Sequence, residues 1–174
     1  KAVVRCTGIT AAPEITAYAR TFDGFIYISA SHNPVGHNGI KFGLNDGGVL
    51  NAQENAKLVS RFLEKCADPQ AMQKAAALLG SCSMSDADWV YAESAGCKKE
   101  ALAAYRSSIR GTITSMKDAS EQDELFAQIR KSAQKRHLGI VCDMNGSART
   151  LSIDSGFFAE NGITFYAINN TAGD

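Results

Sequence analysis

The sequence has no excess charge of either sign and no long apolar run, which excludes two broad classes of protein. Lysine and arginine number 18 together, as do aspartate and glutamate, so the formal net charge is zero. Proteins that bind nucleic acids through their phosphates carry a basic excess, so we expect no nucleic-acid partner. No apolar stretch approaches the roughly 20 residues of a membrane-spanning helix. We therefore expect no membrane partner either.

Closely spaced cysteines are also missing. The five cysteines are scattered, with none two or three positions from another: Cys6, Cys66, Cys82, Cys97 and Cys142. This odd number and wide spacing argue against a disulfide framework and against a zinc ribbon. Reduced thiols are typical of cytosolic proteins, so we predict a cytoplasmic location.

Several sequence motifs of known chemistry are absent. Neither glycine-rich phosphate loop, G-x-x-x-x-G-K-[ST] or G-x-G-x-x-G, occurs, and nor does the G-x-S-x-G elbow of many hydrolases. What remains has the composition of an ordinary globular protein, with 45% hydrophobic and 21% charged residues. Its function must therefore be sought in a less common motif.

Strand and helix patterns alternate at the start of the chain. An apolar run at 2–5, a helix with Pro13 in its first turn and Thr10 as a possible cap, and a buried strand at 25–30 follow one another. This strand–helix–strand order favours a parallel pair of strands. Asp46-Gly47-Gly48, between two further apolar segments, predicts a hairpin turn.

Helical patterns dominate the middle of the chain. Asn51 is the expected cap of an amphipathic helix over 52–67, and a second helix follows to about residue 79. Further helices are predicted at 86–95, 98–109 and 116–137, the last with Ser120 as its cap. A new β-α-β unit then begins, with strands at 138–142 and 163–168 and a helix at 150–160.

Ser31 directly follows the strand at 25–30, where open α/β sheets place groups that bind ligands. A serine hydroxyl needs a base, a lowered pKa or a metal to act as a nucleophile. His32 is adjacent, but neighbours in extended chain point to opposite sides, so a Ser-His pair requires a turn at Asn33-Pro34. Lys41 lies ten residues on, and a hydroxyl, an imidazole and an ammonium together suit an anion such as phosphate.

Each of these residues also has an ordinary interpretation. Ser31 suits a turn or a cap, and Asn38-Gly39 predicts a turn in any protein. His32 and His37 could form a metal pair, but no third ligand is nearby. Taken singly, these residues leave a functional and a structural interpretation open.

The combination of residues is more specific. "SASHNP" at 29–34 and "NGIK" at 38–41, separated by three residues, resemble the catalytic loop of the α-D-phosphohexomutases, the phosphoglucomutase and phosphomannomutase superfamily. That family reads [TS]-x-S-H-N-P, a short spacer and N-G-x-K, and every specified position is matched. Residues 8–22 resemble the family's helix before the catalytic strand, with Ala12-Pro13 where Thr-Pro is usual. Residues 137–148 resemble the opening of its second domain.

The resemblance implies an enzyme that interconverts hexose 1-phosphate and hexose 6-phosphate through a phosphoserine and a bisphosphate intermediate. Ser31 would carry the phosphoryl group, to which Mg²⁺ as cofactor would bind. His32 would assist proton transfer or position the sugar hydroxyl, and Lys41 would stabilise charge on the phosphoryl group in flight. The expected substrate- or phosphate-binding residues are Asn33, Asn38 and Gly39.

The implied fold is α/β. Residues 1–136 would form a three-layer α/β/α domain 1, lacking its start, with a mixed, largely parallel sheet and the catalytic loop at 29–41. Residues 137–174 would begin a second, similar domain. The family's D-G-D-x-D-R metal aspartates, its sugar-recognition loop and its R-x-S-G-T-E-P phosphate loop do not occur. We therefore expect domains 2–4 of the same polypeptide to complete the site, and this fragment alone to be inactive with little Mg²⁺ affinity.

Two alternatives remain open at this stage. Phosphoglucosamine mutase shares the same loop, and the residues that select the hexose phosphate lie in the missing domains. A catalytically silent relative could keep the loop only as a sugar-phosphate-binding site. An intact metal motif in the rest of the polypeptide would favour the enzyme.

Overall fold

The computed structural model describes residues 3–31, 33–34 and 36–173. The helices are α1 (Ala12–Tyr18), α2 (Ala52–Ala67), α3 (Pro69–Gly80), α4 (Met84–Ala92), α5 (Ser94–Thr114), α6 (Ala119–Arg136) and α7 (Asp154–Glu160), with 3₁₀ turns η1 (Ala19–Thr21) and η2 (Ala148–Leu151). The strands are β1 (Gly24–Ile28), β2 (Ile40–Leu44), β3 (Gly139–Asp143) and β4 (Thr164–Ile168). They form two separate two-stranded sheets, β1-β2 antiparallel and β3-β4 parallel.

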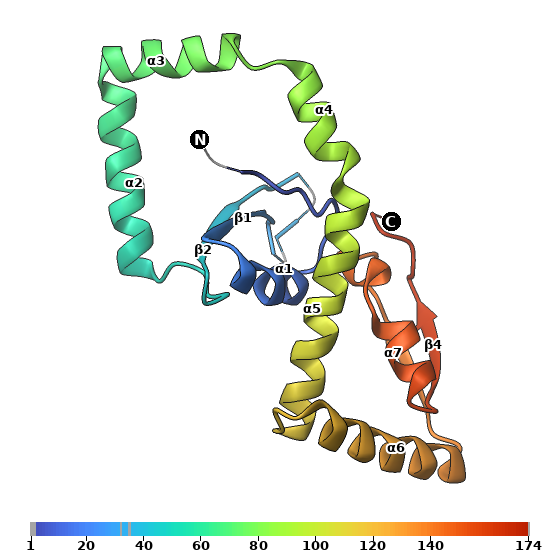
Figure 1. Cartoon of the computed structure of the whole chain (residues 1–174). Coiled ribbons are helices and arrows are strands. Elements are labelled where there is room, and N and C mark those ends of the chain that lie inside the picture. Colours follow the sequence, from blue (N-terminus) through green and yellow to red (C-terminus); the bar gives the residue numbers. More distant parts are fainter. Residues whose placement is uncertain (1–2, 32, 35, 174) are drawn as a thin grey trace.

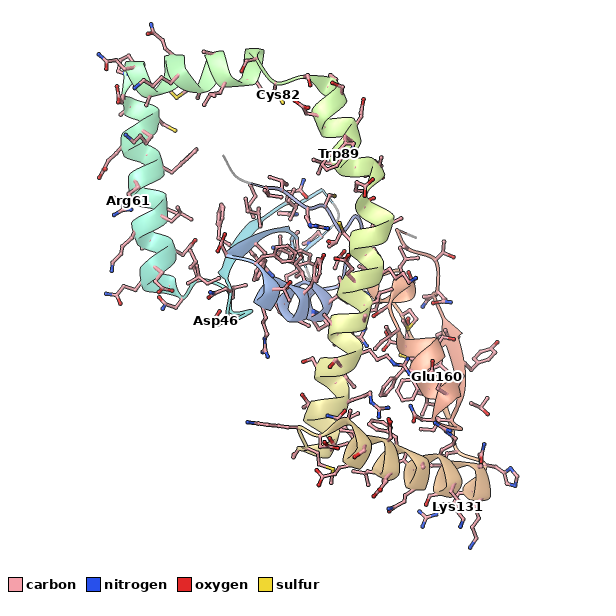
Figure 2. All side chains as sticks on the ribbon, viewed as in Figure 1. Asp46, Arg61, Cys82, Trp89, Lys131 and Glu160 are labelled. Atoms are coloured by element: carbon pink, nitrogen blue, oxygen red, sulfur yellow. The ribbon has the colours of Figure 1, made fainter. Side chains whose placement is uncertain are left out.

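The chain is open rather than closely packed. Helices α2, α3 and α4 form a frame around β1 and β2, while α5 runs past α1 towards α6 (Figure 1). None of the residues in α2, α3 or α4 is buried, and side chains such as Arg61 project freely from the frame (Figure 2). In the described ranges, no helix is both long enough and apolar enough to cross a membrane.

The best-packed contact lies between α1 and α5. Ala101 of α5 is completely buried there, and its small side chain lets the two helices approach closely. Lys98 of α5 forms an ion pair with Glu14 of α1, and the Tyr18 hydroxyl donates a hydrogen bond to the Glu100 carboxylate. Helix α1 is thus held on α5 by both packing and charge.

The other half of α5 holds the C-terminal unit of β3, α7 and β4. Arg149 Nη1 donates a hydrogen bond to Tyr105 Oη at 2.9 Å. The Arg106 guanidinium pairs with Glu160 and lies over the Phe157 ring, 5.7 Å from its centroid. Helix α5 therefore contacts both ends of the chain.

The predicted parallel pair of strands near the N-terminus is wrong. Residues 3–7 form no strand, and β1 instead pairs antiparallel with β2, from Gly24 opposite Leu44 to Ile28 opposite Ile40. A hairpin brings together segments close in the sequence, whereas a parallel pair needs a longer crossover. The predicted β-α-β unit at the C-terminus, by contrast, is confirmed by the parallel register of β3 and β4.

The three-layer α/β/α arrangement is not confirmed. In the part of the chain that is described, no sheet has more than two strands. The outward face of β1 carries Ile26 and Ile28, which are 66% and 71% exposed. A third layer would have to cover such a face, and α2 does not reach it.

Some of the helix caps and turns predicted from the sequence are confirmed, and one cap is wrong. Asn51 caps α2, since its Oδ1 accepts a hydrogen bond from the Glu54 amide at 3.0 Å, and Leu44 N donates to Gly48 O across the predicted turn. Asp118, not Ser120, caps α6, because its carboxylate accepts from two amides of the first turn.

Two further predicted helix starts differ. Thr10 does not cap α1, because its hydroxyl donates instead to the carbonyls of Thr7 and Gly8. The helix predicted at 150–160 begins only at Asp154, after the 3₁₀ turn η2. At Thr10 the hydroxyl competes locally for backbone groups.

Candidate functional site

The predicted serine loop connects β1 to β2 and closes their hairpin. Ile28 and Ile40 are the last paired residues, and just beyond them Ser29 N donates a hydrogen bond to Gly39 O at 2.9 Å. This bond places Ser29, the first residue of S-A-S-H-N-P, beside Gly39 of N-G-I-K, so the two halves of the predicted motif are adjacent. The hairpin gives the motif a defined base.

Gly39 has a steric reason to be glycine. A Cβ atom at this position would lie 2.9 Å from the Ser29 carbonyl oxygen, closer than real Cβ contacts allow. The two strands can approach each other at the base of the loop only because this side chain is missing. Gly39 thus shapes the base of the loop. The predicted turn at Asn38-Gly39 is wrong, because neither residue lies in a turn and Gly39 instead accepts the hydrogen bond from Ser29 N.

Ser31 is exposed and its backbone is left-handed, with φ of 58°. This conformation is uncommon for a residue with a side chain, and such residues are concentrated at functional sites. The Ser31 amide donates a hydrogen bond to Ser29 Oγ at 3.1 Å, which holds the turn. The predicted nucleophile is therefore both accessible and held in a strained conformation.

The middle of the loop contains a turn close to the predicted one. Asn33 N donates to Ala30 O at 3.1 Å, one residue before the turn expected at Asn33-Pro34. His32 lies outside the described residues. His37 Nδ1 lies 3.1 Å from the Pro34 carbonyl oxygen. Asn33 is exposed, as is Asn38, so both amides are open to a ligand.

Lys41 belongs to β2 rather than to the loop itself. It lies directly opposite Tyr27 of β1, and cross-strand partners share one face of the sheet. Among the residues that the structure describes, no carboxylate pairs with Lys41. Its half-buried side chain can therefore offer its charge to an anion.

Tyr27 is a residue of this region that the sequence motifs did not indicate. Its hydroxyl donates a hydrogen bond to the Thr10 carbonyl at 3.1 Å. Only the register of β1 against β2 shows that this tyrosine faces Lys41. A short apolar strand gives no signal of such a role.

The residues present do not form a magnesium site by themselves. Within the described ranges, no group of three or more His, Cys, Asp or Glu side chains could hold a metal ion. Mg²⁺ prefers carboxylate and carbonyl oxygens in octahedral geometry, and the charged residue nearest the loop in sequence is the cation Lys41. A phosphate on Ser31 would give this loop an anionic ligand for the ion.

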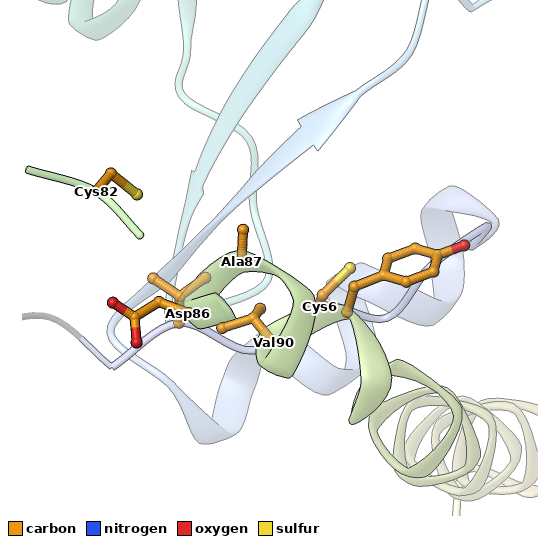
Figure 3. A pocket seen from close by; sticks show the side chains of 7 residues that line it. Cys6, Cys82, Asp86, Ala87 and Val90 are labelled. Atoms are coloured by element: carbon orange, nitrogen blue, oxygen red, sulfur yellow. The ribbon is translucent and has the colours of Figure 1, made fainter. Parts of the chain in front are cut away.

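A hollow of the described chain lies away from the serine loop. It measures about 410 Å³ and is formed by the N-terminal segment and α4, with Cys82 at its far side (Figure 3). Its lining is mostly apolar: Val4, Cys6, Cys82, Asp86, Ala87, Val90 and Tyr91. None of the predicted site residues lines it; Ser31, Asn33 and Asn38 lie instead in an exposed loop.

The comparisons with known proteins agree with the loop's motif. Residues 2–67 match the family model described as phosphoglucomutase/phosphomannomutase, alpha/beta/alpha domain I. The match includes α1, the β1-β2 hairpin with its serine loop, and α2, but not α5. No curated protein matches the chain. Residues 2–67, which include the serine loop, are thus similar to domain I of the phosphoglucomutases and phosphomannomutases.

Proposed function

We propose that the chain provides the phosphoserine part of a phosphohexomutase that interconverts hexose 1-phosphate and hexose 6-phosphate. The observation that supports this is the position of Ser31. It is exposed and left-handed, in the connecting loop of a hairpin that brings both halves of the family motif together. It also lies within the segment that matches the family.

In the proposed reaction, phosphorylated Ser31 gives its phosphoryl group to a hydroxyl of the sugar monophosphate. The bond from phosphorus to Ser31 Oγ breaks as the bond to the sugar oxygen forms, and the hydroxyl proton leaves with the help of His32. The bisphosphate then returns its other phosphoryl group to Ser31. Lys41 stabilises the negative charge of the group in transfer, with Asn33, Asn38 and the backbone at Gly39 as further donors.

This cycle needs no nucleotide as phosphoryl donor, which agrees with the lack of nucleotide-binding motifs in the sequence. All five cysteines are free thiols, as expected of a protein of the cytoplasm. The sequence composition is thus compatible with a cytoplasmic isomerase that uses a phosphoserine.

The other parts of the active site lie outside this chain in our proposal. Residues 1–136 belong to domain 1, and residues 137–174 begin domain 2; the parallel β3-β4 pair supports a new α/β unit there. Further domains of the same polypeptide supply the metal aspartates, the sugar-recognition loop and the second phosphate site. Mg²⁺ is accordingly the cofactor of the complete protein, and the present chain alone is inactive.

The test uses the complete polypeptide. After incubation with a hexose 1,6-bisphosphate, phosphopeptide mass spectrometry is expected to find phosphate on Ser31, and Ser31→Ala is expected to abolish mutase turnover. Ser60→Ala, on the exposed surface of α2, is the matched control and should keep full turnover. Normal turnover by Ser31→Ala would contradict the proposal.

The same assay separates the related activities. Turnover is measured with glucose-, mannose- and glucosamine-phosphates, and the preferred substrate identifies the mutase. Binding of these phosphates without any turnover by the unaltered protein would overturn the enzymatic proposal and favour a silent sugar-phosphate-binding relative.

A further inference from the structure

We propose that Tyr27 is a positioning residue of the serine loop, because its hydroxyl ties β1 to the segment just before α1 and so fixes the strand pair that carries Lys41. This inference rests on the proposed function of the loop. Tyr27 does not touch the reacting atoms in this proposal. It acts through Lys41, its partner across the strands.

The first step is the bond from β1 to the segment before α1. Tyr27 Oη donates to the Thr10 carbonyl at 3.1 Å, across 17 positions of sequence. Thr10 is 5% exposed, and its own hydroxyl donates to the Thr7 carbonyl at 2.9 Å. The acceptor therefore lies in a buried and internally bonded stretch of backbone.

The second step links this stretch to the rest of the molecule. The amide of Ala11, next to Thr10, donates to Glu14 Oε2 at 3.4 Å. Glu14 in turn pairs with Lys98 of α5, and its side chain is completely buried. The acceptor of the Tyr27 hydroxyl is thus attached to the longest helix of the described chain.

The third step concerns what else holds β1. Tyr27 is the only residue of this strand with a polar side chain. On the opposite face, Ile26 and Ile28 are 66% and 71% exposed, so no packing fixes the strand from that side. The Tyr27 hydroxyl thus adds a hydrogen bond to the contacts between β1 and α1.

The last step connects the strand to the reaction. Directly opposed residues of an antiparallel pair have Cβ atoms about 5 Å apart, so the stem of Lys41 lies beside Tyr27. Displacing a catalytic group by about 1 Å can slow a reaction by about 100-fold. A hairpin that moves relative to α1 would carry Lys41 away from the phosphoryl group.

The experiment uses Tyr27→Phe in the complete polypeptide, since this change removes the hydroxyl and keeps the ring. We expect kcat to fall about tenfold while KM stays within about twofold, because misplacing Lys41 weakens the transition state more than substrate binding. Tyr105→Phe is the matched control. It also removes a hydrogen-bonded hydroxyl, from α5 to Arg149, and should leave kcat unchanged.

The outcomes separate this inference from the proposed function. An unchanged kcat in Tyr27→Phe, a loss only in KM, or an equal loss in Tyr105→Phe overturns the positioning role while Ser31→Ala stays inactive. Turnover by Ser31→Ala overturns the proposed function itself. If Tyr27→Phe does not fold, Thr10→Val replaces it, because it frees the backbone that holds the acceptor; an unchanged kcat there overturns the inference.

Discussion

Glu14 of α1 and Lys98 of α5 form an ion pair across 84 positions of sequence, with the glutamate side chain fully buried. Glu14 lies inside the segment 2–67 that matches the family, whereas Lys98 lies outside it. The segment that carries the serine loop is therefore supported by a helix that the family match does not include. Helix α5 is needed to keep α1, and the hairpin bonded to it, in place.

Removing the cation of this pair is expected to destabilise the chain strongly. Lys98→Met keeps much of the side chain but leaves the Glu14 carboxylate buried without its partner, and breaking a buried pair in this way costs about 3 kcal/mol. Urea unfolding followed by circular dichroism measures the change. Lys99→Met is the control, since this neighbouring lysine is exposed and its loss should change the free energy of unfolding by less than about 0.5 kcal/mol. Equal losses in the two variants would show that the Glu14–Lys98 ion pair does not stabilise the fold.

The left-handed backbone of Ser31 can be tested separately from its hydroxyl. Ser31→Gly and Ser31→Ala both remove the hydroxyl, but only glycine adopts φ of 58° without a steric cost. We expect the glycine variant to be more stable to urea than the alanine variant by about 1 kcal/mol.

The matched control for this comparison is an exposed helical serine. At Ser60, in the middle of α2, alanine should instead be more stable than glycine by about 1 kcal/mol, because helix interiors disfavour glycine. The same order of stability at both positions would contradict a strained conformation at Ser31.

Features set by neighbouring residues were predictable from the sequence. The Asn51 cap depends on residues three apart, and the turn at Gly47-Gly48 depends on glycine itself. The serine motif was recognisable because its residues lie within a span of 13 positions, 29–41. The structure then explains one of them physically, since Gly39 lets the strands approach at the base of the loop.

Features set by distant residues were not predictable. The run at 2–5 has the apolar character of a strand and was expected to pair with β1. The strand that β1 pairs with is instead β2, which follows it in the sequence. Nothing in the local pattern of Tyr27 indicates its bond to Thr10, and nothing in Lys98 indicates a buried glutamate 84 positions away. Such contacts depend on how elements pack, which a periodic pattern does not specify.

The close approach at Gly39 predicts a steric effect of alanine at that position. Gly39→Ala would push its Cβ against the Ser29 carbonyl oxygen and open the base of the serine loop. We expect a loss of about 1–3 kcal/mol in the free energy of unfolding, typical of overpacking. Mutase turnover of the complete polypeptide should fall with it, because the two halves of the motif separate.

Gly96→Ala is the control for this substitution. Gly96 lies in α5, and a Cβ atom there would meet no other atom within 4 Å, so alanine should stabilise the helix by about 0.5–1 kcal/mol. Urea unfolding of both variants measures whether each substitution raises or lowers the free energy of unfolding. A stabilising effect of Gly39→Ala would show that the strands do not need to approach so closely.

The C-terminal unit makes a prediction about pH. Asn169 Nδ2, just after β4, donates a hydrogen bond to Asp143 Oδ1 at the end of β3, 2.9 Å away. This bond and a second one from the Asn145 amide hold the pKa of Asp143 below its ordinary value, because both stabilise the charged carboxylate. Asn169→Ala should therefore raise the pKa of Asp143 towards that ordinary value, as measured by NMR titration of its carboxyl carbon.

The sign of the effect on stability follows from the lowered pKa. A carboxylate with a lower pKa in the folded than in the unfolded state adds stability above the unfolded value and loses it as the pH falls through the folded value. The unaltered chain should therefore lose more stability on acidification through this window than Asn169→Ala does. Asn170→Ala, at the exposed neighbouring position, should titrate like the unaltered chain. An Asp143 pKa that is the same in all three proteins would show that Asn169 does not hold the ends of β3 and β4 together.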